Sequence, residues 1–141
     1  MEGQELHVSP FCDDGTMPED YPISKFYALL TEAFKKFGGD IHIVERLADL
    51  MRETGFVNVR EEIIKVPIGT WAKNKTLRLV GMYWRMAIND LLPAMGGKPF
   101  LSLGMSPEEI EVFLVGVRKA LADTKVHSYV NFHFVYGQKP E

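Results

Sequence analysis

Apolar residues recur at three- and four-residue spacing in the first part of the chain, a pattern that predicts two helices, each with one buried face. The first helix runs from Ile23 to Phe37 and stops at Gly38-Gly39. Asp40 is placed to cap the second helix, which Gly55 terminates. The apolar stripes consist of Phe26, Leu30, Ala33, Phe34 and Phe37 in the first helix and of Val44, Leu47, Ala48 and Met51 in the second.

The same helical spacing returns in the second half of the chain. It predicts a third helix from Leu77 to Leu91, which Pro93 and Gly96-Gly97 interrupt. Ser106 then opens a capping box that Glu109 closes, and a proline fills the first helical position between them. The apolar stripe of this fourth helix consists of Ile110, Phe113, Leu114, Val117 and Leu121.

Three segments have the composition of β-strands. Glu2 to Val8 is short and ends at Ser9-Pro10, and Phe56 to Val66 mixes β-branched with charged residues before Pro67. Val126 to Tyr136 alternates two sets of side chains, so it predicts a long strand with two different faces. The even-numbered set is Val126, Ser128, Val130, Phe132 and Phe134, and the odd-numbered set is His127, Tyr129, Asn131, His133 and Val135.

Composition and charge narrow the class of protein. A chain of 141 residues with 46% apolar and 25% charged residues, and without repeats or linkers, predicts one globular domain over residues 1–141. The formal charge of −3 argues against nucleic acid and anionic lipid as partners. The apolar runs are shorter than the roughly 20 residues of a membrane helix. The single cysteine, Cys12, and the lack of a signal-like opening predict a reducing, cytoplasmic location.

The order of strand, helices, strand, helices and strand, with the segments GFVNVREEIIKVPIGTW and HSYVNFHFVYGQKP, resembles the end of class I S-adenosylmethionine-dependent methyltransferases. The similarity is to the LaeA-like group of fungal specialised metabolism and covers nearly the whole chain. It implies an α/β fold with a three-stranded sheet and about four to five helices. Glu2 to Val8, Asn58 to Val66 and Val126 to Tyr136 would be the family's strands five, six and seven. The seventh strand would lie between the others and run antiparallel.

The resemblance also bears on the cofactor. The family binds S-adenosylmethionine through a glycine-rich turn after its first strand and an acidic residue after its second. Here Gly38-Gly39 and Gly96-Gly97 follow helices rather than strands. We therefore expect no cofactor and no autonomous methyltransferase activity. The chain is either a naturally truncated protein, which the untagged start Met1-Glu2-Gly3 favours, or material cut at that point.

The odd-numbered face of the last predicted strand carries the sharpest candidate chemistry. His127, Tyr129 and His133, with Asn131 among them, combine imidazole, phenol and amide groups that can exchange protons with a bound molecule. We predict the first three as catalytic residues. The alternative is a polar strand face that lies under a loop or in solvent.

Metal binding is not expected from the sequence. His127 and His133 are six residues apart on a strand, roughly 20 Å, and cannot bind one ion. His7 and His42 have no obvious acidic or imidazole companion at ligand spacing. Asp13-Asp14 precedes a glycine without the other oxygen ligands of a calcium loop, so these two residues are interpreted as turn formers.

A second group mixes large aromatic side chains with polar ones along a loop and the third predicted helix. The resemblance implies that this region covers the acceptor substrate, and an apolar pocket with a few polar groups suits a small molecule. The alternative places Trp84 in the core and leaves Arg85 and Asp90 in solvent. The predicted substrate-binding residues are Trp71, Tyr83, Trp84, Arg85 and Asn89.

Three functional hypotheses follow from the resemblance. The first is a truncated pseudo-methyltransferase of polyketide-type metabolism that binds an apolar intermediate and assists a cofactor-free cyclisation or isomerisation, either alone or in a multi-enzyme complex. The second is a non-catalytic partner subunit of another biosynthetic enzyme, and the third is the carboxyl-terminal fragment of a true methyltransferase. The expected partners are the small-molecule intermediate and either a second copy, which we favour, or another biosynthetic protein. The protein partner would pair with the exposed edge of Glu2 to Val8.

Overall fold

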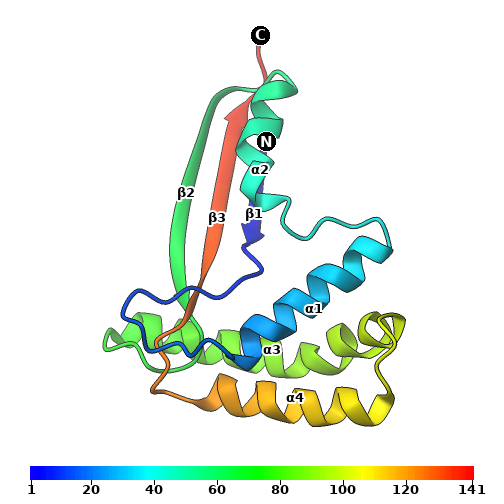
Figure 1. Cartoon of the computed structure of the whole chain (residues 1–141). Coiled ribbons are helices and arrows are strands. Elements are labelled where there is room, and N and C mark those ends of the chain that lie inside the picture. The colour runs from blue at the N-terminus through cyan, green and yellow to red at the C-terminus, as the bar shows by residue number, and fades with distance from the viewer.

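The computed structural model describes residues 1–141 and contains three strands and four helices. Figure 1 shows the strands as a narrow sheet that stands above a layer of helices, with α2 beside the sheet. The elements, in chain order, are β1 (Glu2–Leu6), α1 (Pro22–Lys36), α2 (Val44–Glu53), β2 (Val57–Pro67), α3 (Lys75–Ser102), α4 (Pro107–Ala122) and β3 (Tyr129–Gln138).

The sheet has the strand order β1-β3-β2, and β3 is antiparallel to both neighbours. Leu6 of β1 and Ile64 of β2 both lie opposite Phe132 of β3, which fixes the register across the sheet. This arrangement confirms the predicted α/β fold, in which the last strand lies between the other two and runs against them.

The two faces of the sheet pack against different helices. Phe132 lines an apolar hollow together with Trp84 of α3. Val135 is fully buried against Ala48 and Met51 of α2. Even-numbered residues of β3 therefore face α3 and odd-numbered residues face α2, because neighbouring side chains of a strand point to opposite faces.

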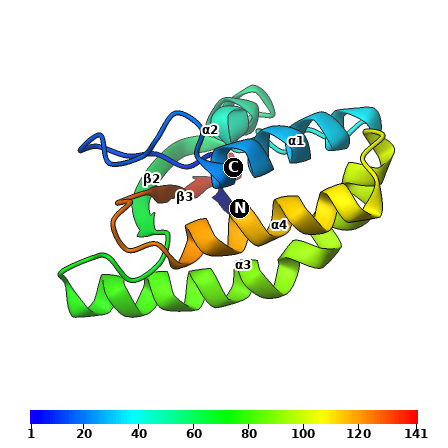
Figure 2. The same cartoon turned by 60° about the horizontal axis from the view of Figure 1, so that its bottom comes forward.

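Most of the buried apolar surface lies among α1, α3 and α4, which form the layer seen from below in Figure 2. The main core there contains 15 buried residues, whereas the core that holds α2 on the sheet contains three. Phe26, Leu92, Phe100 and Leu114 are the largest of its fully buried side chains. We infer that the helical layer supplies most of the stability. None of the four helices has the length and apolar character that a membrane crossing needs.

The predicted helix starts and ends are confirmed where their signals lie within a few residues of each other. The Ser106 Oγ accepts a hydrogen bond from the Glu109 backbone N–H at 3.2 Å, and the Glu109 carboxylate accepts one from the Ser106 N–H at 2.7 Å. Gly38 and Gly55 adopt positive φ angles of 74° and 94°, as expected of glycines that end helices.

The third predicted helix was wrong at its end. Instead of stopping near Pro93, α3 continues to Ser102. Gly96 packs against α4 so closely that a Cβ would lie 3.2 Å from Leu114, and Phe100 is fully buried one turn further on. Packing against α4 thus outweighs the hydrogen bond that a proline removes from the helix.

Three other boundaries also differ from the predictions. The α2 helix starts at Val44 without a side-chain cap, because the Asp40 carboxylate accepts hydrogen bonds from the His42 backbone and the Arg46 side chain instead. The first strand stops at Leu6 rather than Val8. The last strand begins at Tyr129 rather than Val126, so His127 belongs to the loop before the sheet.

Candidate functional site

A hollow of about 500 Å³ lies where the loop before β3 meets the loop before α3. It brings His127, a predicted catalytic residue, beside Trp71, a predicted substrate-binding residue. It also includes Asp14, which sequence analysis interpreted as a turn former. The lining residues are Asp14, Trp71, Ala72, Lys73, Asn74, Leu77 and His127.

A tight turn in the amino-terminal loop holds His127 in place. The Asp14 carboxylate lies 2.6 Å from the His127 Nδ1. The same carboxylate accepts hydrogen bonds from the backbone and hydroxyl of Thr16, while the Thr16 hydroxyl oxygen accepts one from the His127 backbone N–H at 2.8 Å. Gly15 makes this turn possible with a φ of 75°.

The hydrogen bonds around Asp14 fix its charge. The bond from His127 is the largest cause that holds the pKa of the Asp14 carboxyl below its ordinary value, and bonds from Thr16 and Cys12 act in the same direction. An ionised Asp14 accepts the Nδ1–H of His127, which leaves the Nε2 of a neutral ring as the free acceptor. A carboxylate that orients an imidazole in this way is the arrangement of a general base.

Trp71 forms a fixed wall beside this imidazole. The two ring centroids are 5.0 Å apart. The indole N–H donates to the Ser128 carbonyl at 2.8 Å, which holds the ring in position. Trp71 therefore gives the hollow an apolar surface next to the free nitrogen of His127.

The other two predicted catalytic residues lie outside the hollow. The Tyr129 hydroxyl donates to Asp13 at 2.7 Å, and the Lys65 ammonium lies 4.5 Å from the centre of its ring. The Asp13 carboxylate also accepts a hydrogen bond from the Lys65 ammonium, and the bonds from Lys65 and then Tyr129 lower the pKa of the Asp13 carboxyl. His133 is buried, with its Nδ1 2.7 Å from the Glu61 carboxylate. For Tyr129, the structure matches the alternative of a strand face that lies under a loop.

The predicted substrate-binding residues do not form one site either. Tyr83 and Trp84 line a second hollow, of about 360 Å³, on the opposite face of the sheet from His133. The indole nitrogen of Trp84 is buried there without a hydrogen-bond partner. Arg85 and Asn89 line neither hollow. The second hollow is apolar throughout and is lined by Leu6, Val66, Val80, Tyr83, Trp84, Ala87 and Phe132.

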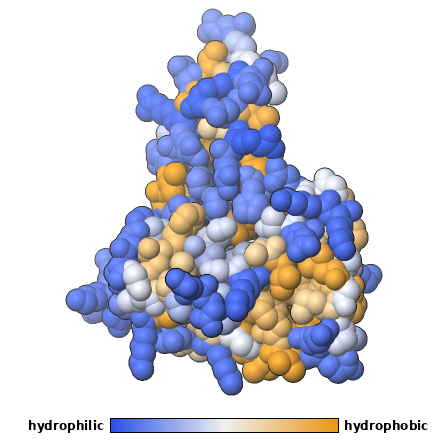
Figure 3. Space-filling view, viewed as in Figure 1, coloured by the Kyte–Doolittle hydropathy of each residue, from blue (hydrophilic) through white to orange (hydrophobic).

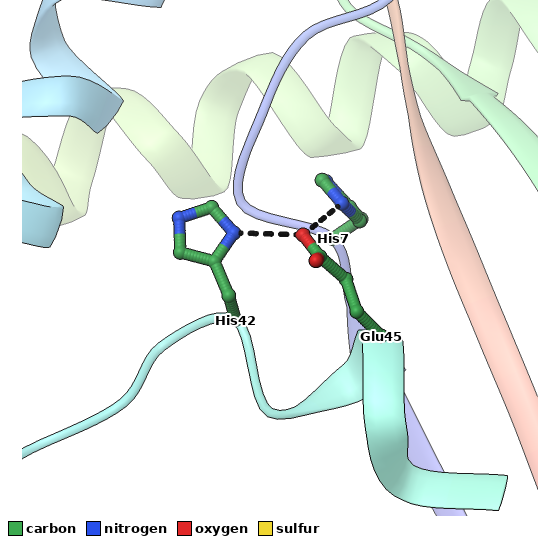
Figure 4. Close-up of side chains that lie close together, drawn as sticks. All are labelled: His7, His42 and Glu45. Carbon is green, nitrogen blue, oxygen red and sulfur yellow. Dashed lines mark hydrogen bonds and ion pairs between the residues drawn. The ribbon is translucent and has the colours of Figure 1, made fainter.

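The expectation that His7 and His42 lack a companion was wrong. Figure 4 shows both imidazoles directed at the carboxylate of Glu45. One Glu45 oxygen lies 2.9 Å from His7 Nε2 and 3.1 Å from His42 Nδ1. The three-residue spacing of His42 and Glu45 at a helix start was a signal in the sequence, but the approach of His7 depends on the folded chain.

Comparison with known proteins gives clear relatives. No family model and no solved structure matches the chain. It is 34% identical over 144 residues to the probable methyltransferase tdiE of Emericella nidulans, covering 99% of this chain and 44% of that protein. It is 27% identical over 143 residues to the secondary metabolism regulator LAE1 of Cochliobolus heterostrophus, covering 100% of this chain and 47% of the relative.

A third relative, the methyltransferase pytC of Aspergillus terreus, is 28% identical over 141 residues, which are 99% of this chain and 44% of that protein. The chain thus spans somewhat less than half the length of the curated relatives it matches. The chain is a homologue of the LaeA-like methyltransferases of fungal secondary metabolism and corresponds to their carboxyl-terminal part.

Proposed function

We propose that this methyltransferase-like chain binds a small, largely apolar biosynthetic intermediate in the hollow beside His127 and assists its cofactor-free isomerisation or cyclisation. The observation that carries the proposal is the 2.6 Å contact between Asp14 and His127 at the edge of that hollow. The relatives, described as methyltransferases and regulators of secondary metabolism, support the pathway class.

The proposed chemistry requires only a base that removes a proton and later returns it. His127 Nε2 would remove a proton from a carbon next to a carbonyl group, and Asp14 would stabilise the imidazolium that forms. Lys73, at the same hollow, would offset the negative charge of the enolate. Where a carbon–carbon double bond is conjugated with the enolate, return of the proton to the far carbon of that bond completes an isomerisation. In a cyclisation, the enolate carbon attacks a second carbonyl of the same molecule, and the new alkoxide takes the proton.

The walls of the hollow fit the body of such a molecule. Trp71, Ala72 and Leu77 provide apolar surface, and the Asp14 carboxylate lies against His127. Small-molecule sites commonly combine mostly apolar walls with a few placed polar groups. A carbonyl compound with an aromatic or aliphatic body is therefore the substrate class that we expect.

The proposal is tested by solvent-deuterium exchange into an aromatic methyl ketone, followed by mass spectrometry. We expect His127→Gln to lower the protein-dependent exchange rate by about 100-fold, the range of general base catalysis. Asp14→Asn should also lower it, because the imidazole loses its orienting carboxylate. Tyr83→Phe changes only the other hollow and should leave the rate unchanged. Unchanged exchange in His127→Gln would contradict the proposal.

A second candidate function, as a partner subunit, is favoured by the free edge of β1. Met1 pairs with Gly137 and His7 with Asn131 through backbone hydrogen bonds. Because bonded and non-bonded positions alternate along antiparallel strands, Glu2, Gln4 and Leu6 direct their backbone groups away from β3. No further strand pairs with this edge. A second copy of the chain, or another biosynthetic protein, could add a strand there.

A further inference from the structure

We propose that His7, His42 and Glu45 form a binding site for one divalent transition-metal ion, with zinc as the best match. One donor atom from each residue lies within 4.8 Å of the other two. Figure 4 shows that the three side chains come from different segments: His7 follows β1, His42 precedes α2, and Glu45 lies in the first turn of α2. The convergence is therefore a product of the fold.

The hydrogen bonds of Thr31 determine which nitrogen of His42 is free. The Thr31 hydroxyl donates its only hydrogen to the Tyr27 carbonyl at 2.8 Å. Its oxygen therefore accepts from the His42 Nε2–H, 3.0 Å away. In a neutral ring, this leaves the lone pair of Nδ1 facing the Glu45 carboxylate at 3.1 Å. Two acceptors face each other, and a cation between them satisfies both.

A partner on the far side of the ring is a common property of metal-binding histidines. The second nitrogen of such a ring usually donates to a carbonyl, carboxylate or water, which fixes the tautomer and the ring orientation. Thr31 provides this support for His42. The arrangement thus presents Nδ1 to an ion before any ion binds.

His7 is held firmly by its surroundings. Its ring lies 5.0 Å from the ring of Phe11 and 6.2 Å from the stacked ring of His133. Only 13% of its side chain is exposed, and Nε2 is the nitrogen that meets Glu45, at 2.9 Å. A rigid imidazole directed at the carboxylate reduces the ordering cost of binding an ion.

The donor set selects the class of ion. Two imidazoles and a carboxylate with a fourth position left for water form a known zinc set, whereas magnesium and calcium prefer oxygen ligands. Ligands of tetrahedral zinc lie roughly 3.3 Å apart, so the contacts of 2.9 and 3.1 Å need only small shifts. Glu45 is 53% exposed and pairs with no lysine or arginine, so an ion can reach it.

A bound ion would join the end of β1 to the start of α2. The α2 helix is otherwise held by the small core of Ala48, Met51 and Val135. A ligand that binds only the folded state stabilises that state. Zinc should therefore raise the melting temperature, and this effect should require Glu45.

The test is a calorimetric titration of zinc chloride into the untagged, chelator-treated chain. We expect one equivalent to bind with a dissociation constant in the micromolar range or below. Glu45→Gln and His42→Ala should each weaken binding by at least about tenfold. His127→Ala is the matched control, because it removes another imidazole that lies beside a carboxylate. Circular dichroism establishes that each variant is folded.

Two further measurements test the support of His42 by Thr31 and the coordination of the bound ion. Thr31→Val should weaken zinc binding by about tenfold through loss of the support for His42. Cobalt should give the intense visible absorption of a four-coordinate ion with the parent chain and lose it in Glu45→Gln. Absence of saturable binding by the folded parent overturns the proposal. An equal loss of affinity in His127→Ala and His42→Ala means adventitious binding to surface histidines only and also overturns it.

Discussion

Phe132 and His133 are neighbours in β3, but their side chains lie on opposite faces of the sheet. Phe132 shares the apolar hollow with Trp84, whereas His133 contacts Glu61 and stacks on His7. The sheet therefore separates Tyr83 and Trp84 from most of the predicted catalytic residues. The hollow beside His127 is the place where a predicted catalytic side chain and a predicted substrate-binding one meet.

The close approach of α3 to the loop after β2 predicts a strong effect at Gly81. A Cβ at this position would collide with the Gly69 carbonyl oxygen. We expect Gly81→Ala to lower the free energy of unfolding by roughly 3 kcal/mol, because backbone must move to admit the methyl group. Gly97→Ala, in the same helix with nothing within 4 Å, should raise it by about 0.5 kcal/mol. Urea denaturation measures both, and equal effects would contradict this packing.

Trp84 and Tyr83 are neighbours in α3 whose side chains differ in burial, so their contributions to stability can be compared. Trp84 packs against the main core, whereas Tyr83 is 60% exposed. We expect Trp84→Ala to cost about 3 kcal/mol in the free energy of unfolding and Tyr83→Ala to cost less than about 0.5 kcal/mol. Chemical denaturation measures the free energy of unfolding of both variants. A Trp84 variant as stable as the parent would show that the helix presents a different face to the sheet.

The lowered pKa of the Asp14 carboxyl predicts how the stability of the chain depends on pH. Its folded-state pKa is lowered, chiefly by the hydrogen bond from His127, below that of the unfolded chain. The stabilisation is therefore complete above the unfolded value of about 3.9 and is lost as pH falls through the folded value. Asp14→Asn should reduce the loss of stability in this acid range. Urea midpoints as a function of pH measure it, with the exposed Asp20→Asn as control.

Much of the fold could be predicted from the sequence because its signals are local. The stripe of α1 and the capping box at Ser106 each depend on residues within a few positions. The sheet order came from the family resemblance rather than from any pattern in the chain. The path of α3 through Pro93 could not be predicted, because packing against α4 decides it.

The candidate site was predicted less well for the same reason. His127 and Trp71 were identified by residue type, but Asp14 is 113 positions from His127, and no spacing rule connects them. Glu45 likewise meets His7 only after β1 and α2 pack together. Contacts between distant segments are set by tertiary packing, which a single sequence does not display.

The free edge of β1 predicts self-association through strand pairing. Gln4→Pro removes an N–H that points away from β3, so it should leave the fold intact and abolish dimers. Glu5→Pro is the matched change, because it removes an N–H directed at β3 and should lower stability instead. Sedimentation at micromolar concentration measures the first effect and thermal melting the second. A parent chain that sediments as a monomer would contradict the dimer.

Ligand binding beside His127 is tested most directly with the two tryptophans, since the chain has only two and each lines a different hollow. An aromatic methyl ketone is titrated into the ¹⁵N-labelled chain while both indole N–H signals are followed by NMR. If the hollow beside His127 binds the intermediate, the Trp71 signal shifts with saturation and the Trp84 signal stays in place. A saturating shift of Trp84 alone, or of neither indole, would contradict binding in the hollow beside His127.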